Sequence, residues 1–365
     1  MAAFQNRVSR REALKAATVA AVAGAAGAGV VASLDRLPHV PLAPSVEPFE
    51  GLHQQGITTP APLHVAIVGF DVLTRSRDDL VSVLRAWSTA ARSLADAPGS
   101  RITFTFGFGP TLFQPAALGL SDRLPPSLVP LPPFAGDAID DAASHGDLCV
   151  QVCAADADTA HHGVRAMVNA ARPIARLRWK QTGFRAEGAA TDPTGLFGFR
   201  DGTANLDPTD PAQAARHLWV DAPGSWLHHG TYLVVRRIRL LLDTWDRTSP
   251  AEQQQLIGRR KDTNERLPPT GSSHVELASP DHNAGATLLR RSYSYDAGVD
   301  PNGLQDAGLI FISYQRDPLA QFVPVMGRLS QLDGLRAFSQ HVATAVFAVP
   351  AGPTPDGFVG QDLFR

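Results

Sequence analysis

The spacing of apolar positions predicts alternating strands and helices from about residue 63 onward. Residues 63–70 are rich in apolar and β-branched side chains, which is typical of a strand. In the next segment, 77–94, apolar residues recur with a helical period, and Ser76 stands where an N-cap belongs. The pattern then predicts strands over 102–106, 148–154 and 175–179, and a helix over 156–171.

The second half of the chain repeats this order. It predicts strands over 232–238, 309–314 and 345–349, one helix that begins at Ser249-Pro250, and another over 318–332. Two successive units of strand–helix–strand–strand–helix–strand predict an α+β fold of two ferredoxin-like modules with antiparallel sheets, of the dimeric α/β-barrel type. We assign the N-terminal module to residues 62–200 and the C-terminal module to residues 201–365.

The residues before these modules follow neither period. Ser9-Arg10-Arg11 opens a twin-arginine motif, and the charge-free run over 16–34 consists mostly of Ala, Gly and Val. Such a weakly hydrophobic run predicts a twin-arginine signal peptide over 1–34 and a linker over 35–61; a short membrane anchor is the alternative. Because this route exports folded proteins, we expect a periplasmic or extracellular protein with a tightly bound cofactor and no stable membrane span after processing.

Composition narrows the function classes. A chain of 365 residues with 44% hydrophobic content can bury a large core in more than one domain. The net charge of −2 and the pI of about 6.6 give no sign of the basic face that nucleic acid requires. The two cysteines, Cys149 and Cys153, are four residues apart in a predicted strand, about 13 Å, which is too far for a disulfide. We interpret both as buried apolar side chains.

Three kinds of residue in the second half could carry chemistry. Asp201 lies in a glycine-bracketed turn, although an aspartate in a turn is more often only a turn former. His274 lies in an apolar stretch, where a histidine is more often structural than a ligand. Arg290 and Arg291 follow, and the pattern does not settle which of them faces inward. An acid, a cation and an imidazole are the groups that deprotonate a peroxide, polarise its O–O bond and hold a haem iron.

Eight longer segments carry a more specific signal. They are residues 107–113 (GFGPTLF), 146–154 (GDLCVQVCA), 198–205 (GFRDGTAN), 230–237 (GTYLVVRR), 245–248 (WDRT), 273–275 (SHV), 290–295 (RRSYSY) and 308–315 (GLIFISYQ). In this order, and over most of the chain from about Pro62, they resemble the dye-decolourising haem peroxidase family in its twin-arginine-exported branch, which includes proteins of the deferrochelatase/peroxidase kind.

This resemblance implies a b-type haem held without covalent attachment, and the chain has no Cys-x-x-Cys-His motif for attaching one. By motif matching, His274 is the axial iron ligand, Asp201 is the distal acid–base and Arg290 is the distal cation. Arg291 remains the alternative to Arg290. The resemblance also implies that the haem is bound mainly by the C-terminal half.

Further residues are implied around the cofactor. Arg236 matches a family arginine that could pair with a haem propionate, because a guanidinium fork suits a carboxylate. Gly202 and Thr203 belong to the motif beside the cofactor. Asp317 is the candidate for the carboxylate behind the axial histidine.

The resemblance implies a haem-dependent peroxidase that reduces hydrogen peroxide and oxidises dyes, phenols or other organic electron donors through a ferryl intermediate. Two alternatives use the same residues: release of iron from haem, as in a deferrochelatase, or an exported haem carrier. The carrier has no use for Asp201 and Arg290 on the opposite face, so their co-occurrence with His274 favours the enzyme. A homo-oligomer and an iron-uptake partner are further expectations that come with the family.

Overall fold

The computed structural model describes residues 47–114, 118–186, 194–201 and 204–365, all within one compact unit that spans Ser45–Arg365. The predicted signal peptide, residues 35–46 of the predicted linker, and Gly202 and Thr203 of the predicted site lie outside the described residues. No helix among the residues described is both long and apolar enough to span a membrane.

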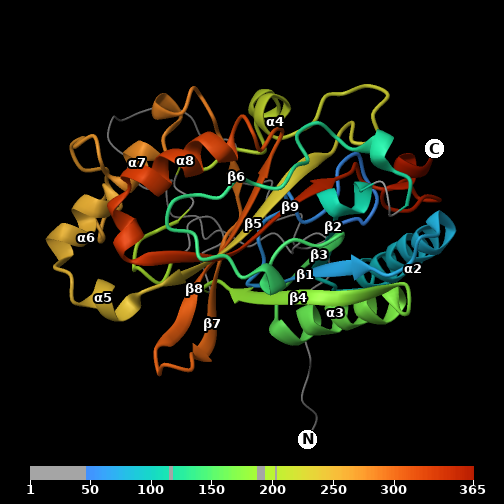
Figure 1. The fold of residues 1–365 in the computed structure, drawn as a ribbon, viewed down its shortest axis with the longest axis horizontal. Helices are drawn as coiled ribbons and strands as arrows, with labels where there is room; N and C mark the ends of the chain where they lie inside the picture. Colours follow the sequence, from blue (N-terminus) through green and yellow to red (C-terminus); the bar gives the residue numbers. More distant parts are fainter. Residues whose placement is uncertain (1–46, 115–117, 187–193, 202–203) are drawn as a thin grey trace, which may run out of the picture. The chain divides into compact units, whose positions relative to one another are not determined.

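The first module has the predicted order of elements (Figure 1). Its elements are β1 (His64–Val72), α2 (Arg77–Ala95), β2 (Ile102–Phe108), β3 (Leu148–Ala154), α3 (Ala157–Ala171) and β4 (Ala175–Phe184), with short 3₁₀ helices η1 (Pro110–Phe113), η2 (Ser121–Arg123) and η3 (Asp141–Ala143). The strands pair antiparallel in the order β4-β1-β3-β2, which is the ferredoxin-like arrangement.

The second module repeats that arrangement with more helix between its strands. Its elements are α4 (Pro211–His217), β5 (Thr231–Leu240), α5 (Leu242–Asp246), α6 (Pro250–Ile257), α7 (His274–Leu277), η4 (Pro280–His282), β6 (Leu289–Arg290), β7 (Tyr293–Val299), β8 (Gln305–Gln315), α8 (Phe322–Leu332), η5 (Gly334–Ala337), β9 (Ser339–Val349) and η6 (Gln361–Phe364). Here β9, β5, β8 and β7 pair antiparallel in the same ferredoxin-like order.

The two modules close into one barrel-like sheet. Strand β2 pairs with β9 through Phe108 and Ala348, and β4 pairs with β7 through Phe184 and Ser294. The pairing of β5 with β8 completes the ring, and β6 adds to β8. The predicted α+β fold of two ferredoxin-like modules is therefore confirmed.

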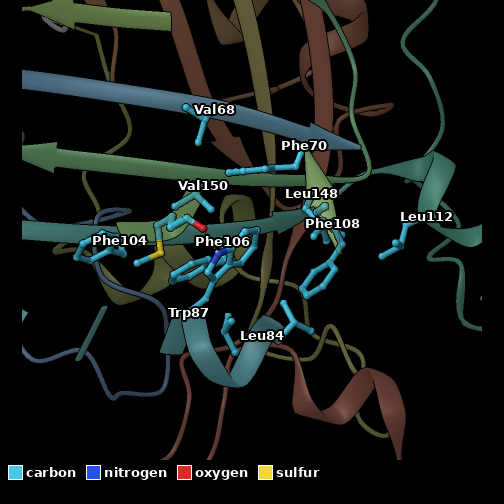
Figure 2. Close-up of a cluster of buried hydrophobic side chains, with 14 of the residues drawn as sticks. Val68, Phe70, Leu84, Trp87, Phe104, Phe106, Phe108, Leu112, Leu148 and Val150 are labelled. Atoms are coloured by element: carbon cyan, nitrogen blue, oxygen red, sulfur yellow. Dashed lines mark hydrogen bonds between the residues drawn. The ribbon is translucent and has the colours of Figure 1, made fainter. Parts of the chain in front are cut away.

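The core of the first module lies between its sheet and its two long helices. Figure 2 shows Trp87 of α2 packed among phenylalanines of the neighbouring strands. The indole Nε1 donates a hydrogen bond to the carbonyl oxygen of Met167 in α3, at 2.7 Å, which joins the two helices. Ser76 caps α2 as predicted, because its hydroxyl accepts a hydrogen bond from the backbone N–H of Asp79.

The two cysteines and part of the predicted linker belong to the packed fold. Cys149 and Cys153 are both free and fully buried in β3, which confirms the interpretation of them as small apolar side chains. Part of the predicted linker packs against the fold: Phe49 and Ile57 are buried, and the Gln54 amide bonds to the backbone of β2.

Candidate active site

A cavity of about 330 Å³ lies in the C-terminal half, and the residues that line it fall between Gly195 and His341. Much of its apolar lining comes from β5, β8 and α8: Ile238, Leu240, Leu309, Phe311, Phe322, Val325, Met326 and Leu329. Figure 1 shows α7 and α8 side by side above these strands. This size is within the range of about 300–1,000 Å³ that is typical of ligand pockets.

His274 enters the cavity from the first position of α7. Ser273 and Glu276 form a capping box, which fixes where this short helix begins. Gly258, which ends α6 with φ of +89°, allows the close approach, because a Cβ there would lie 2.5 Å from Ser273 Oγ. The local sequence therefore sets the direction in which the imidazole points.

Asp333 holds that imidazole from behind. The Nδ1 of His274 lies 2.6 Å from Oδ2 of Asp333, whose side chain is only 6% exposed. Burial by itself lowers the pKa of His274, but the adjacent Asp333 carboxylate outweighs it, so that the pKa is raised above its ordinary value. With Nδ1 donating to a carboxylate, Nε2 keeps its lone pair for a metal.

Sequence reasoning placed the wrong carboxylate behind this histidine. Asp317 instead caps the start of the next segment, where its Oδ1 accepts hydrogen bonds from the backbone N–H groups of Leu319 and Ala320. Asp333 is 59 residues from His274 in the chain. Its local sequence suggests only a turn or helix-cap residue, and its Oδ1 does accept from the N–H of Leu335. No local signal in the sequence distinguishes it.

Asp201 and Arg290 form a second polar pair on the same cavity. Nη1 of Arg290 lies 3.6 Å from Oδ1 of Asp201, and the side chains are 26% and 31% exposed, respectively. Asn205 fixes the backbone of Arg290, because its amide makes two hydrogen bonds with it, of 2.7 and 2.8 Å. Asn205 stands in the GFRDGTAN segment, but its role as a clamp was not predicted.

The two neighbouring arginines have opposite surroundings. Arg290 lines the cavity, whereas Arg291 is buried on the other side of the strand, where its guanidinium donates to the carbonyl oxygens of Thr59 and Pro60. Side chains of adjacent residues in an extended strand point to opposite faces. Of the two, Arg290 is the one that can act on a ligand in the cavity.

Arg236 lies at the wall of the cavity but is only 1% exposed. Its guanidinium is ion-paired with Asp137, and its Nε donates to Nδ1 of His341 at 3.1 Å. The fork that was expected to bind a propionate is therefore already engaged by a protein carboxylate. His341, which also lines the cavity, was not predicted.

The lining suits an iron porphyrin better than a bare metal ion. Within the described part of the chain, no group of three or more His, Cys, Asp or Glu side chains could hold a metal ion, so His274 offers a single ligand. A haem iron arrives with four nitrogen ligands and needs only one more from the protein. The lining also contains six arginines but only two aspartates, which favours a dianionic ligand such as haem: Arg200, Arg236, Arg259, Arg266, Arg290 and Arg336.

Comparison with protein families decides the identity. The family models described as Dyp-type peroxidase, N-terminal and Dyp-type peroxidase, C-terminal match residues 54–185 and 192–354. This chain belongs to the Dyp-type peroxidase family. It is therefore a haem peroxidase, an oxidoreductase that uses peroxide and an electron donor.

The relatives of this peroxidase carry two different names, dye-decolorizing peroxidase and deferrochelatase. It is 35% identical to a dye-decolorizing peroxidase of Thermobifida fusca over 369 residues, which cover 86% of this chain and 84% of that protein. It is 31% identical to the deferrochelatase of Escherichia coli K12 over 371 residues, with 87% of each chain covered.

Solved structures agree with this family assignment. Ferric DtpA from Streptomyces lividans superposes with a TM-score of 0.82 at 37% identity, over 90% of this chain and 99% of that one. A DyP-type peroxidase from Cellulomonas bogoriensis superposes with a TM-score of 0.81 at 37% identity, over 88% and 98% of the two chains.

Proposed function

We propose that this peroxidase holds a non-covalent b-type haem through His274 and activates hydrogen peroxide with Asp201 and Arg290. The observation that carries the proposal is that one cavity is lined both by the His274–Asp333 pair and by the Asp201–Arg290 pair. When bound, the haem supplies the iron at which peroxide is reduced and the redox capacity to oxidise a donor.

Asp201 is the proton carrier in this proposal. A carboxylate can take a proton from one peroxide oxygen and deliver it to the other, which leaves as water. Its Oδ1 lies 3.6 Å from Nη1 of Arg290 on the wall of the same cavity, so that both side chains can contact one ligand. Asn205 holds the Arg290 backbone in place through two hydrogen bonds.

Arg290 stabilises the charge that develops as the O–O bond breaks. A guanidinium presents its N–H donors in a fixed planar geometry, and Asn205 fixes the backbone of Arg290 before the substrate arrives. Removal of one such preorganised donor typically costs about 10²–10³-fold in rate. Arg291 cannot replace it, because its side chain is buried on the other face of the strand.

A stopped-flow experiment tests this function. We expect one equivalent of hydrogen peroxide to change the Soret band of the haem-loaded protein within milliseconds, and a phenol or dye to restore the original band. Asp201→Ala and Arg290→Ala should slow the first phase by roughly a hundredfold or more and leave the haem bound. A first phase of unchanged rate in Asp201→Ala would remove Asp201 from the mechanism.

Release of iron from haem is the second candidate function, because relatives that are 31% identical carry the name deferrochelatase. The same cavity and the same histidine would serve it. Product analysis after turnover separates the two: free protoporphyrin and iron indicate iron release, whereas intact haem and oxidised donor indicate peroxidase turnover alone. If iron is released, we expect the protein to have a partner that takes up the iron.

We further propose export by the twin-arginine route to the periplasm or the cell exterior. The proposal rests on Arg10 and Arg11 before the apolar run over 16–34. Replacement of both arginines by lysine should retain the protein in the cytoplasm with its peroxidase activity intact. Export of the double variant would contradict the route.

A homo-oligomer is the remaining expectation from the family. Light scattering on the exported protein tests it.

A further inference from the structure

Two residues at the wall of the cavity, Arg236 and His341, form a chain of polar contacts with Asp137 that the proposed mechanism does not use. Arg236 on β5 is ion-paired with Asp137, and its Nε donates to Nδ1 of His341 on β9 at 3.1 Å. The Arg236 side chain is only 1% exposed, and its guanidinium lies over the ring of Phe134. The guanidinium is therefore shielded from solvent. His341 is half-buried and lines the cavity.

The contact between Arg236 and His341 fixes the tautomer of the imidazole. A guanidinium has only donors, so Nδ1 of His341 must accept and must therefore carry no proton. A neutral imidazole has one N–H group, which in His341 is then on Nε2. Burial first, and the charge of Arg236 second, lower the pKa of His341 to about 3, so that the ring stays neutral at working pH.

The same contact strengthens Nε2–H as a donor. The positive guanidinium that donates to Nδ1 draws electron density from the imidazole ring, which makes Nε2–H a stronger donor. Hydrogen bonds in a chain strengthen one another in this way at low dielectric. The positive charge of Arg236 itself is already paired with Asp137, and its fork is turned to that carboxylate. Of the two residues, His341 is therefore the one placed to present a hydrogen-bond donor to a ligand in the cavity.

We propose that His341, held by Arg236, binds a haem propionate through Nε2–H. A carboxylate is the acceptor that gains most from such a polarised donor, and the porphyrin brings two. The excess of arginines along the lining favours the same dianionic ligand. The inference rests on the proposed function only in requiring that haem occupies this cavity. It makes His341 a positioning residue, with no part in proton transfer to peroxide.

Two porphyrins and two variants test the contact. The protein is loaded either with iron protoporphyrin IX or with its dimethyl ester, in which the propionates accept only weakly, and the rate of haem transfer to apomyoglobin is measured. Gln places an amide N–H near the position of Nε2, whereas Asn reaches only as far as Nδ1. We expect His341→Asn to lose the free-acid haem about tenfold faster than the wild type, as for a lost hydrogen bond to a charged group.

The controls decide between this contact and a merely structural role. We expect His341→Gln to retain the free-acid haem nearly as well as the wild type, and all three proteins to lose the dimethyl ester at one rate. His341→Leu serves as a second variant without a donor if His341→Asn does not fold. If His341→Asn loses both porphyrins faster by the same factor, or loses neither faster, the propionate contact is overturned. The proposed peroxidase function would still stand. Failure of the wild type to retain either porphyrin would overturn the proposed function together with this inference.

Discussion

At the scale of single residues, this site depends on pairs in which one side chain fixes the state of another. Asp333 makes His274 a donor at Nδ1 and a ligand at Nε2, whereas Arg236 gives His341 the opposite tautomer. The two histidines line the same cavity with opposite proton positions. Their neighbours, rather than the residue type, therefore decide what each imidazole can bind.

Asp333→Asn tests the first of these pairs. The amide oxygen can still cap η5 by accepting from the N–H of Leu335. The variant has no carboxylate to accept the hydrogen bond from Nδ1 of His274, so His274 becomes a weaker ligand. We expect the iron(III)/iron(II) potential to rise and the affinity for haem to fall about 10- to 100-fold, as measured by redox titration and haem transfer. Asp317→Asn is the matched control, because Asp317 only caps a backbone turn, and it should alter neither. Equal effects of both variants would contradict the assigned role of Asp333.

Tyr295 gives a prediction for alkaline pH. Burial raises its pKa from 10.0 to about 12, the Arg237 guanidinium opposes this, and the Asp306 carboxylate adds to it. The unfolded chain releases this proton above pH 10, while the folded protein retains it up to about pH 12. Folding stability should therefore be unaffected by this group below pH 10 and should fall between pH 10 and 12. Tyr295→Phe should reduce that fall in urea titrations. An unchanged pH profile would show that Tyr295 titrates normally.

At the scale of elements, α7 is a single turn that contributes little buried surface, so its position depends on its ends. The capping box of Ser273 and Glu276 fixes its start, and Gly258 at the end of α6 allows Ser273 to approach. An error of one ångström in a ligand-bearing element is enough to spoil a site. The glycine therefore contributes to the placement of His274, although it does not line the cavity.

Gly258→Ala and Gly271→Ala separate backbone strain from this packing effect. Both glycines have positive φ, +89° and +80°, so each substitution should cost about 1 kcal/mol or more in the free energy of unfolding. A Cβ at Gly258 would also lie 2.5 Å from Ser273 Oγ, whereas a Cβ at Gly271 meets nothing within 4 Å. We expect only Gly258→Ala to accelerate haem loss as well, measured by transfer to apomyoglobin. Equal haem loss in the two variants would contradict the role of this contact.

At the scale of the whole molecule, the ring of strands makes the two modules dependent on one another. Strand β2 of the first module pairs with β9 of the second, and β4 pairs with β7. Separation of the modules would expose both junctions and the buried faces that they cover, such as Phe108 and Ala348. Most of the residues that line the cavity belong to the second module, but Arg236 in its wall is ion-paired with Asp137 of the first module.

We expect the chain to unfold as one cooperative unit. Calorimetry on residues 45–365 should give a single transition with matching calorimetric and van't Hoff enthalpies. A fragment of residues 201–365, expressed alone, should neither fold stably nor retain haem. Arg236 would lose Asp137, β9 would lose its pairing with β2, and β7 would lose its pairing with β4. A folded fragment that retains haem would show that the modules are independent.

The sequence by itself determined the elements and much of the identity. Apolar periodicity located the long helices and every strand except β6 and β7. Local chemistry placed the cap at Ser76, because a cap depends on neighbours a few residues away. The order of the two modules followed from the repeated sequence of elements. Motif segments pointed to the peroxidase family, and they named His274, Asp201 and Arg290, which line one cavity.

Only the tertiary structure decided which residues act on one another. It identified Asp333 in place of Asp317, gave Arg290 rather than Arg291 to the cavity, and joined Arg236 to Asp137 and His341. The partners in the first and third of these contacts are 59 and about 100 residues apart, and strand and helix packing bring them together. No local pattern encodes such a distance, because a turn-forming aspartate and a buried acceptor look alike until the chain is folded.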